Sequence, residues 1–155
     1  MKIKVEPILF DSYLAMIKNS VGSRSFRNFY AYADESKKDI VKGGSLSCAF
    51  FVSSILLFFR LIKEPHLTVA GLVKGMEKSG WREIRKPQIG AVLVWEAVIQ
   101  NNEPHKHIGF YWKANKAISN SSRLRKPISH HWTFGIKSGK PVRRIERIFW
   151  HPKLD

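Results

Sequence analysis

The chain of 155 residues contains a single cysteine, Cys48, which is the clearest candidate for a reactive group. It follows the glycine- and serine-rich segment Gly43–Ser47 and precedes the apolar segment 49–59. This pattern is typical of a helix N-terminus, with Ser45 or Ser47 as the capping residue. Unpaired N–H groups and the helix dipole at that end favour a thiolate, the nucleophilic form of cysteine. The pattern indicates a nucleophile, and a small buried apolar residue is the alternative interpretation.

A cysteine nucleophile needs a base, and His107 is the best placed of the six histidines. It lies in a predicted strand, 105–112, of the sheet on which the Cys48 helix must pack. Ser119 and Asn120 fall on the next predicted strand, and because side chains alternate, only one of them can share the face of His107. Either could fix the tautomer of the imidazole through its second nitrogen. We therefore predict a Cys48–His107 dyad with Ser119 or Asn120 as the orienting group.

A metal site is the competing use of the histidines. His105 and His107 share one face of a predicted strand, and His130 and His131 are adjacent. No Cys-x-x-Cys or His-Glu-x-x-His spacing accompanies them. We therefore expect no metal and no other cofactor, and we expect the segment 130–132 to be a packed tryptophan beside solvated histidines.

Helical and strand patterns occupy different parts of the chain. Apolar periodicity predicts a helix over 8–19 with Asp11 or Ser12 as its cap, a buried helix from Cys48, and a helix over 69–78 capped by Thr68. Strand patterns follow at 90–99, 105–112, 117–120 and 142–150. Helices followed by strands with short turns predict an α+β fold, with helices packed on an antiparallel sheet of about four to six strands.

Length and composition limit the protein classes. A chain of 155 residues is long enough for one domain with a substantial core. One cysteine excludes an intramolecular disulfide, and the apolar run after it is too short to span a bilayer. The N-terminal residues lack the apolar region of a signal peptide. We therefore expect a cytoplasmic location for the sequence as written, whereas a location in the cell envelope would require that a leader was removed.

The net charge is strongly positive, at +15. A basic surface attracts polyanions such as nucleic acid, anionic lipid or acidic cell-wall polymer. No helix-turn-helix, zinc-finger or RNA-binding sheet signature accompanies the charge. The sequence therefore predicts at most non-specific polyanion binding, and a solvated basic face is an equal alternative.

The sequence resembles the papain-fold cell-wall cysteine peptidases and amidases of the NlpC and CHAP type, over about residues 26–122. The resemblance rests on a cysteine that opens a buried helix, a strand opened by glycine, and a His-x-Gly-x-Tyr strand, in that order. The matching segments are Ser47–Val52, Gly80–Trp81, Pro87–Trp95 and His107–Tyr111. The sequence differs from the usual Asp-Cys-Ser-Gly and Gly-Asp motifs of these enzymes at Ser47–Phe50 and Gly90–Ala91.

The resemblance implies a role for each residue of the predicted dyad. Cys48 would be the nucleophile, with its backbone N–H contributing to an oxyanion hole, and His107 would be the general base and acid. Ser119 falls where these enzymes usually place a His, Asn or Gln that orients the base, and Asn120 is its neighbour.

The resemblance also implies a substrate and a substrate-binding residue. Either Tyr30 or Tyr32 would correspond to an upstream tyrosine that shapes the site, although packing is the commoner role of aromatic residues. The implied reaction is hydrolysis of an amide bond, in a peptidoglycan stem peptide. The alternative is a catalytically inactive binding module of the papain fold, or a basic protein associated with nucleic acid.

Overall fold

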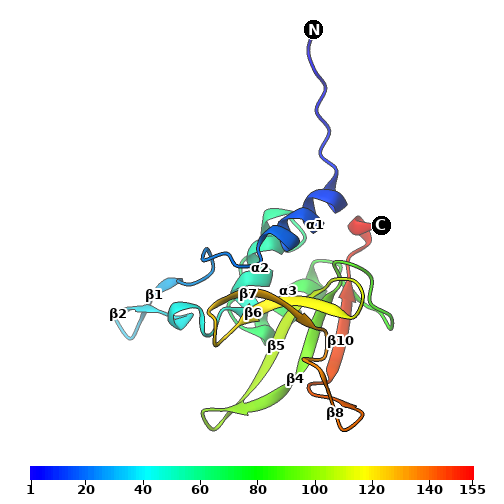
Figure 1. The fold of residues 1–155 in the computed structure, drawn as a ribbon. Coiled ribbons are helices and arrows are strands. Elements are labelled where there is room, and N and C mark those ends of the chain that lie inside the picture. Colours follow the sequence, from blue (N-terminus) through cyan, green and yellow to red (C-terminus); the bar gives the residue numbers. More distant parts are fainter.

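The computed structural model describes residues 1–155, and its three α-helices precede most of its strands along the chain (Figure 1). The α-helices are α1 (Leu9–Asn19), α2 (Cys48–Phe58) and α3 (Val69–Lys78), with short 3₁₀ helices at Lys42–Gly44 and Pro152–Leu154. The strands are β1 (Tyr30–Ala33), β2 (Ser36–Asp39), β3 (Arg82–Glu83), β4 (Val92–Gln100), β5 (Glu103–Tyr111), β6 (Lys116–Ser121), β7 (Lys126–His131), β8 (Ile136–Lys137), β9 (Lys140–Pro141) and β10 (Ile145–Trp150).

Six strands form one antiparallel sheet in the order β3-β10-β4-β5-β6-β7, and two small hairpins, β1–β2 and β8–β9, lie outside it. The predicted α+β class and antiparallel sheet are confirmed, with the number of strands at the upper end of the expected range. The sequence pattern predicts β4, β5, β6 and β10 but none of β1, β2, β3, β7, β8 and β9. Strand β2 consists of polar residues only, and β7 contains a proline and two histidines in place of an apolar alternation.

One face of the sheet packs against α2 and forms the main core. Because α2 is apolar on nearly all sides, most of its residues are buried: Ala49, Phe51, Val52, Ser53, Ile55 and Leu56. The ring of Phe51 packs edge-on against the rings of Phe110 in β5 and Phe26. The N-terminal end of this helix is therefore fixed by apolar packing close to β5 and β6.

The opposite face of the sheet carries a second, smaller core. Leu93, Trp95 and Ala117 are buried there, and the Trp95 Nε1–H donates a hydrogen bond of 2.7 Å to the carbonyl oxygen of Trp132. Trp95 is the direct cross-strand partner of His107, and direct partners lie on the same face of a sheet. His107 therefore lies above this aromatic core, on the face away from α2.

The helix starts agree only in part with the predicted caps. Thr68 caps α3 as predicted, because its Oγ1 accepts a hydrogen bond from the Gly71 N–H. Ser47 occupies the cap position of α2, but its hydroxyl donates to the Phe26 carbonyl, so it does not cap the helix. Asp11 lies inside α1 and does not cap it. The residue at the cap position is Ile8, whose side chain makes no capping hydrogen bond. None of the helices combines the length and apolarity that are needed to cross a bilayer.

Candidate active site

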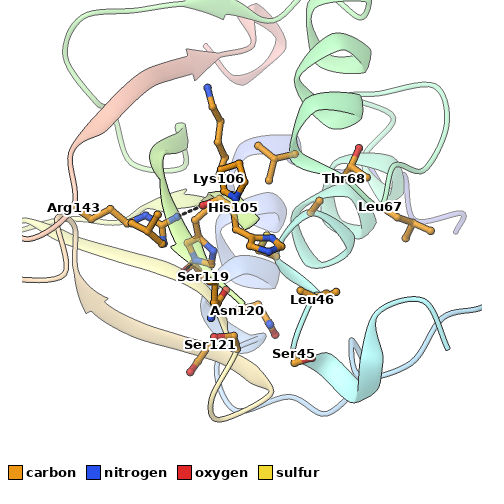
Figure 2. A pocket seen from close by; sticks show the side chains of 18 of the residues that line it. Ser45, Leu46, Leu67, Thr68, His105, Lys106, Ser119, Asn120, Ser121 and Arg143 are labelled. Atoms are coloured by element: carbon orange, nitrogen blue, oxygen red, sulfur yellow. Dashed lines mark hydrogen bonds between the residues drawn. The ribbon is translucent and has the colours of Figure 1, made fainter. Parts of the chain in front are cut away.

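A pocket of about 670 Å³ contains four of the six predicted site residues, namely Cys48, His107, Ser119 and Asn120. Figure 2 shows this pocket from close by, with Ser119 and Asn120 on adjacent positions of β6 and Arg143 approaching from the segment before β10. The start of α2 and the strands β5 and β6 therefore meet at one cavity, as the predicted dyad requires.

Cys48 lies where β5 and β6 separate. The ladder between these strands ends at the pair Phe110–Ile118, and its register would next pair Gly109 with Ser119 and then Ile108 with Asn120. The backbone N–H of Ile108 instead faces the sulfur of Cys48 and lowers the pKa of its thiol. The sulfur therefore lies against the strand position that immediately follows His107.

The protonation state of Cys48 differs from the expectation. Burial raises the pKa of the Cys48 thiol above its ordinary value. Hydrogen bonds from the backbone N–H groups of Ile108 and Ala49, and the positive charge of Arg143, lower the pKa but do not offset burial. Burial at the start of α2 therefore opposes the thiolate that the helix N-terminus favours.

Ser119, and not Asn120, makes the hydrogen bond to His107. The Nε2 of His107 lies 2.8 Å from the Oγ of Ser119. Gly109 permits this approach, because a Cβ at that position would lie only 2.6 Å from the Cβ of Ser119. The bond engages Nε2, so Nδ1 is the ring nitrogen available to exchange a proton with a thiol.

Asn120 has a different role from the one considered in the sequence. Its side chain is 2% exposed, and its Nδ2 donates a hydrogen bond of 2.8 Å to the carbonyl oxygen of Gly44. This bond ties β6 to the segment that leads into Cys48. Asn120 therefore fixes the segment that leads into Cys48, and it makes no hydrogen bond to His107.

The imidazole of His107 is neutral at neutral pH. Burial, together with the positive charges of Arg143 and His130, lowers its pKa to about 3. The pocket is therefore lined by a neutral thiol and a neutral imidazole. Such a pair can act as nucleophile and base if the thiol proton moves to the imidazole as the sulfur attacks.

Arg143 is a pocket residue that the sequence analysis did not identify. Its Nε donates to the carbonyl oxygen of Glu96 at 2.9 Å, and its Nη2 donates to that of His105 at 2.7 Å, the second bond being drawn in Figure 2. These bonds hold the guanidinium between β4 and β5 at the wall of the pocket. In the sequence it belongs to the basic run 137–147, and nothing distinguishes it there from solvated arginines.

The histidines at 130 and 131 are half-buried and hydrogen-bonded to protein groups, which differs from the solvated histidines expected for this segment. His130 lies with its Nε2 2.7 Å from the Oγ of Ser119 and its Nδ1 2.7 Å from the carbonyl oxygen of His131. The Nδ1 of His131 accepts a hydrogen bond from the backbone N–H of Thr133. Trp132 packs on the small aromatic core, as predicted.

Tyr30 and Tyr32 do not reach the pocket. They are 58% and 82% exposed on β1, and the ring of Tyr30 contacts the ammonium of Lys37 in the same hairpin. The hairpin projects from the body of the molecule (Figure 1). The structure therefore does not bring the two predicted substrate-binding tyrosines together with Cys48 and His107, because closeness to Cys48 in sequence does not bring this strand to the pocket.

The donor set at the pocket offers little to a metal ion. No group of three or more His, Cys, Asp or Glu side chains is arranged to hold one.

A comparison with models of known protein families and with curated protein sequences finds no match to this chain.

Proposed function

We propose that the protein is a cysteine hydrolase of the papain-like NlpC and CHAP type, which cleaves an amide bond with Cys48 as nucleophile and His107 as base. The observation that carries the proposal is the pocket shared by these two residues. In it, the backbone N–H of the residue after His107 lowers the pKa of the Cys48 thiol, and Ser119 is hydrogen-bonded to Nε2 of the imidazole.

The proposed reaction follows from the neutral pair. As Sγ of Cys48 attacks the carbonyl carbon, the thiol proton moves to Nδ1 of His107, and the carbonyl oxygen takes the negative charge. The backbone N–H of Cys48, in the first turn of α2, is placed to stabilise that oxygen. The imidazolium then gives its proton to the leaving amine, which leaves a thioester. Water attacks the thioester with His107 again as base, and the carboxylic acid and the free thiol are released.

The charge of the pocket supports an anionic substrate. The charged residues that line it are Lys106 and Arg143, and no carboxylate does so. Lys106 forms an ion pair of 2.7 Å with Glu146, but the hydrogen bonds of Arg143 go to backbone carbonyls. Arg143 therefore keeps its charge available to a ligand carboxylate. Peptidoglycan stem peptides carry such carboxylates, so they remain the substrate class that both the resemblance and the pocket favour.

The test is hydrolysis of purified peptidoglycan and of soluble stem peptides, with the products identified by mass spectrometry. We expect new amine and carboxyl termini with the wild type and none with Cys48→Ala. The exposed Tyr32→Ala variant serves as a matched control that should retain the wild-type rate. Turnover by a correctly folded Cys48→Ala variant would contradict the proposed mechanism.

One observation favours a second candidate, a binding module that has the fold but no activity. Burial raises the pKa of Cys48, so the thiol is less reactive at rest than that of a thiolate enzyme. With a net charge of +15, such a module would bind nucleic acid or another polyanion through its surface. This candidate predicts no turnover of any stem peptide, and salt-dependent binding that is unchanged in Cys48→Ala.

A further inference from the structure

A chain of hydrogen bonds continues beyond the predicted dyad, across three strands of the sheet. It runs from His107 in β5 to Ser119 in β6 and on to His130 in β7, and it ends at the carbonyl oxygen of His131. The three distances are 2.8, 2.7 and 2.7 Å. The proposed function uses only the first of these bonds, so the role of His130 is open.

The carbonyl at the end of the chain determines the direction of each hydrogen bond. A carbonyl oxygen can only accept, so the Nδ1 of His130 must carry a hydrogen and donate it. In a neutral His130 the Nε2 is then an acceptor, and the hydroxyl of Ser119 donates to it. The Ser119 oxygen in turn accepts the hydrogen on Nε2 of His107. His107 is left with a lone pair on Nδ1, the form that a general base needs.

The surroundings of His130 favour this neutral form and hold the ring in place. Its imidazole is stacked on the ring of Phe134, with 4.2 Å between centroids and 17° between planes, and it also lies against Trp95. Burial lowers the pKa of His130. A protonated His130 would donate to Ser119 from Nε2, which would push the serine hydroxyl to donate to His107 and select the wrong tautomer.

We propose that His130 is a positioning residue that acts through Ser119 to keep His107 in the tautomer with its hydrogen on Nε2. It does so by offering the Ser119 hydroxyl an acceptor on the side away from His107. This inference rests on the proposed function for its catalytic consequence, although the tautomer itself can be measured without turnover.

Two substitutions at His130 separate hydrogen bonding from packing. His130→Phe keeps an aromatic ring against Phe134 and removes the acceptor, so the Ser119 hydroxyl is free to donate to His107. His130→Gln places an amide oxygen near the position of Nε2 and restores the acceptor. We expect kcat to fall about 10²-fold in His130→Phe with KM within threefold, and to stay within about fivefold of wild type in His130→Gln.

A double variant tests whether the two residues act as a unit. Ser119→Ala alone should lower kcat by a similar factor, and Ser119→Ala combined with His130→Phe should be no slower than His130→Phe. The proposal would be overturned if the losses of kcat in the two single variants multiplied in the double variant. It would also be overturned if His130→Gln lost as much kcat as His130→Phe, because His130 would then contribute packing only.

The direct measurement is the tautomer of His107 in the full chain, by long-range ¹H–¹⁵N correlation spectra. We expect the hydrogen on Nε2 in the wild type and in His130→Gln, and on Nδ1 in His130→Phe. An unchanged Nε2–H tautomer in His130→Phe would overturn the proposal. Because the spectra need no substrate, they decide this inference even if the wild type hydrolyses nothing, an outcome that would count against the proposed function alone.

Discussion

The two faces of the central sheet position the two halves of the candidate dyad by different means. On one face, Cys48 is placed by the apolar packing of α2, in which Phe51 is fully buried. On the other face, His107 is placed by directed hydrogen bonds through Ser119 to His130, above a small aromatic core. Apolar packing determines whether the chain folds, whereas the hydrogen bonds through Ser119 determine which ring nitrogen of His107 carries a hydrogen. Substitutions on the two faces should therefore affect different measurements.

The largest effect is expected on the helix-packed face. Phe51→Ala would leave a cavity beside Phe26 and Phe110 in the main core, because its ring packs edge-on against both. Such a truncation of a buried phenylalanine costs about 3–5 kcal/mol of the free energy of unfolding. Urea denaturation at pH 7.5 would measure it. A loss below about 1 kcal/mol, or a large change in the tautomer of His107 in the folded fraction, would contradict the division between the two faces.

On the opposite face, we expect His107 to have a smaller effect on the free energy of unfolding, and one that depends on pH. The pKa of His107 is about 3 in the folded state, against an ordinary value of 6.5 that applies after unfolding. Between these pH values the unfolded chain binds one proton more than the folded chain does. The contribution of the neutral imidazole to the free energy of unfolding is therefore complete above pH 6.5 and is lost as the pH falls toward 3. For one proton the slope reaches about 1.4 kcal/mol per pH unit.

Denaturation curves at several pH values between 4.5 and 7.5 would measure this slope. The wild type should lose stability with acid more steeply than His107→Gln, and the difference isolates the single histidine. Phe51→Ala should keep the wild-type slope at a lower stability. Parallel curves for the wild type and His107→Gln would show that the imidazole is not held neutral by the fold.

The smallest effect is expected at Arg143, which acts on residues of both faces. Its charge lowers the pKa of both Cys48 and His107. Arg143→Met should therefore raise both pKa values, so that the thiol loses its proton at higher pH and the imidazole stays protonated to higher pH. Alkylation by iodoacetamide across pH 6–10 should show its inflection displaced to higher pH. Arg144→Met is the matched control, because Arg144 is exposed and paired with Glu96 outside the pocket. An inflection displaced to lower pH would contradict the assigned role of Arg143.

Sequence reasoning predicts the parts of the site that depend on periodicity. The apolar run after Cys48 predicts a buried helix, and the strand alternation around His107 restricts the orienting residue to Ser119 or Asn120. It does not predict the protonation of Cys48, because the effect of the helix end competes with burial and only the structure shows which is larger.

Other features are missed because their signal lies outside any local pattern. His130 lies in a strand without apolar alternation, so nothing in the sequence aligns it with Ser119. Arg143 is one cation in a basic run, and only its bonds to two strand carbonyls distinguish it. Tyr30 and Tyr32 show the converse error, in which a short separation along the chain is taken as closeness in space.

The early end of the ladder between β5 and β6 has a consequence for the whole arrangement. In a sheet that is hydrogen-bonded along its full length, neighbouring strands use the backbone N–H groups, and a helix on one face is separated from the side chains on the other. Here the β5–β6 ladder ends before Ile108, and the N–H of Ile108 lowers the pKa of the Cys48 thiol instead of bonding to the neighbouring strand. Extending the β5–β6 pairing as far as Ile108 would therefore take this N–H away from the sulfur and raise the pKa of the Cys48 thiol further.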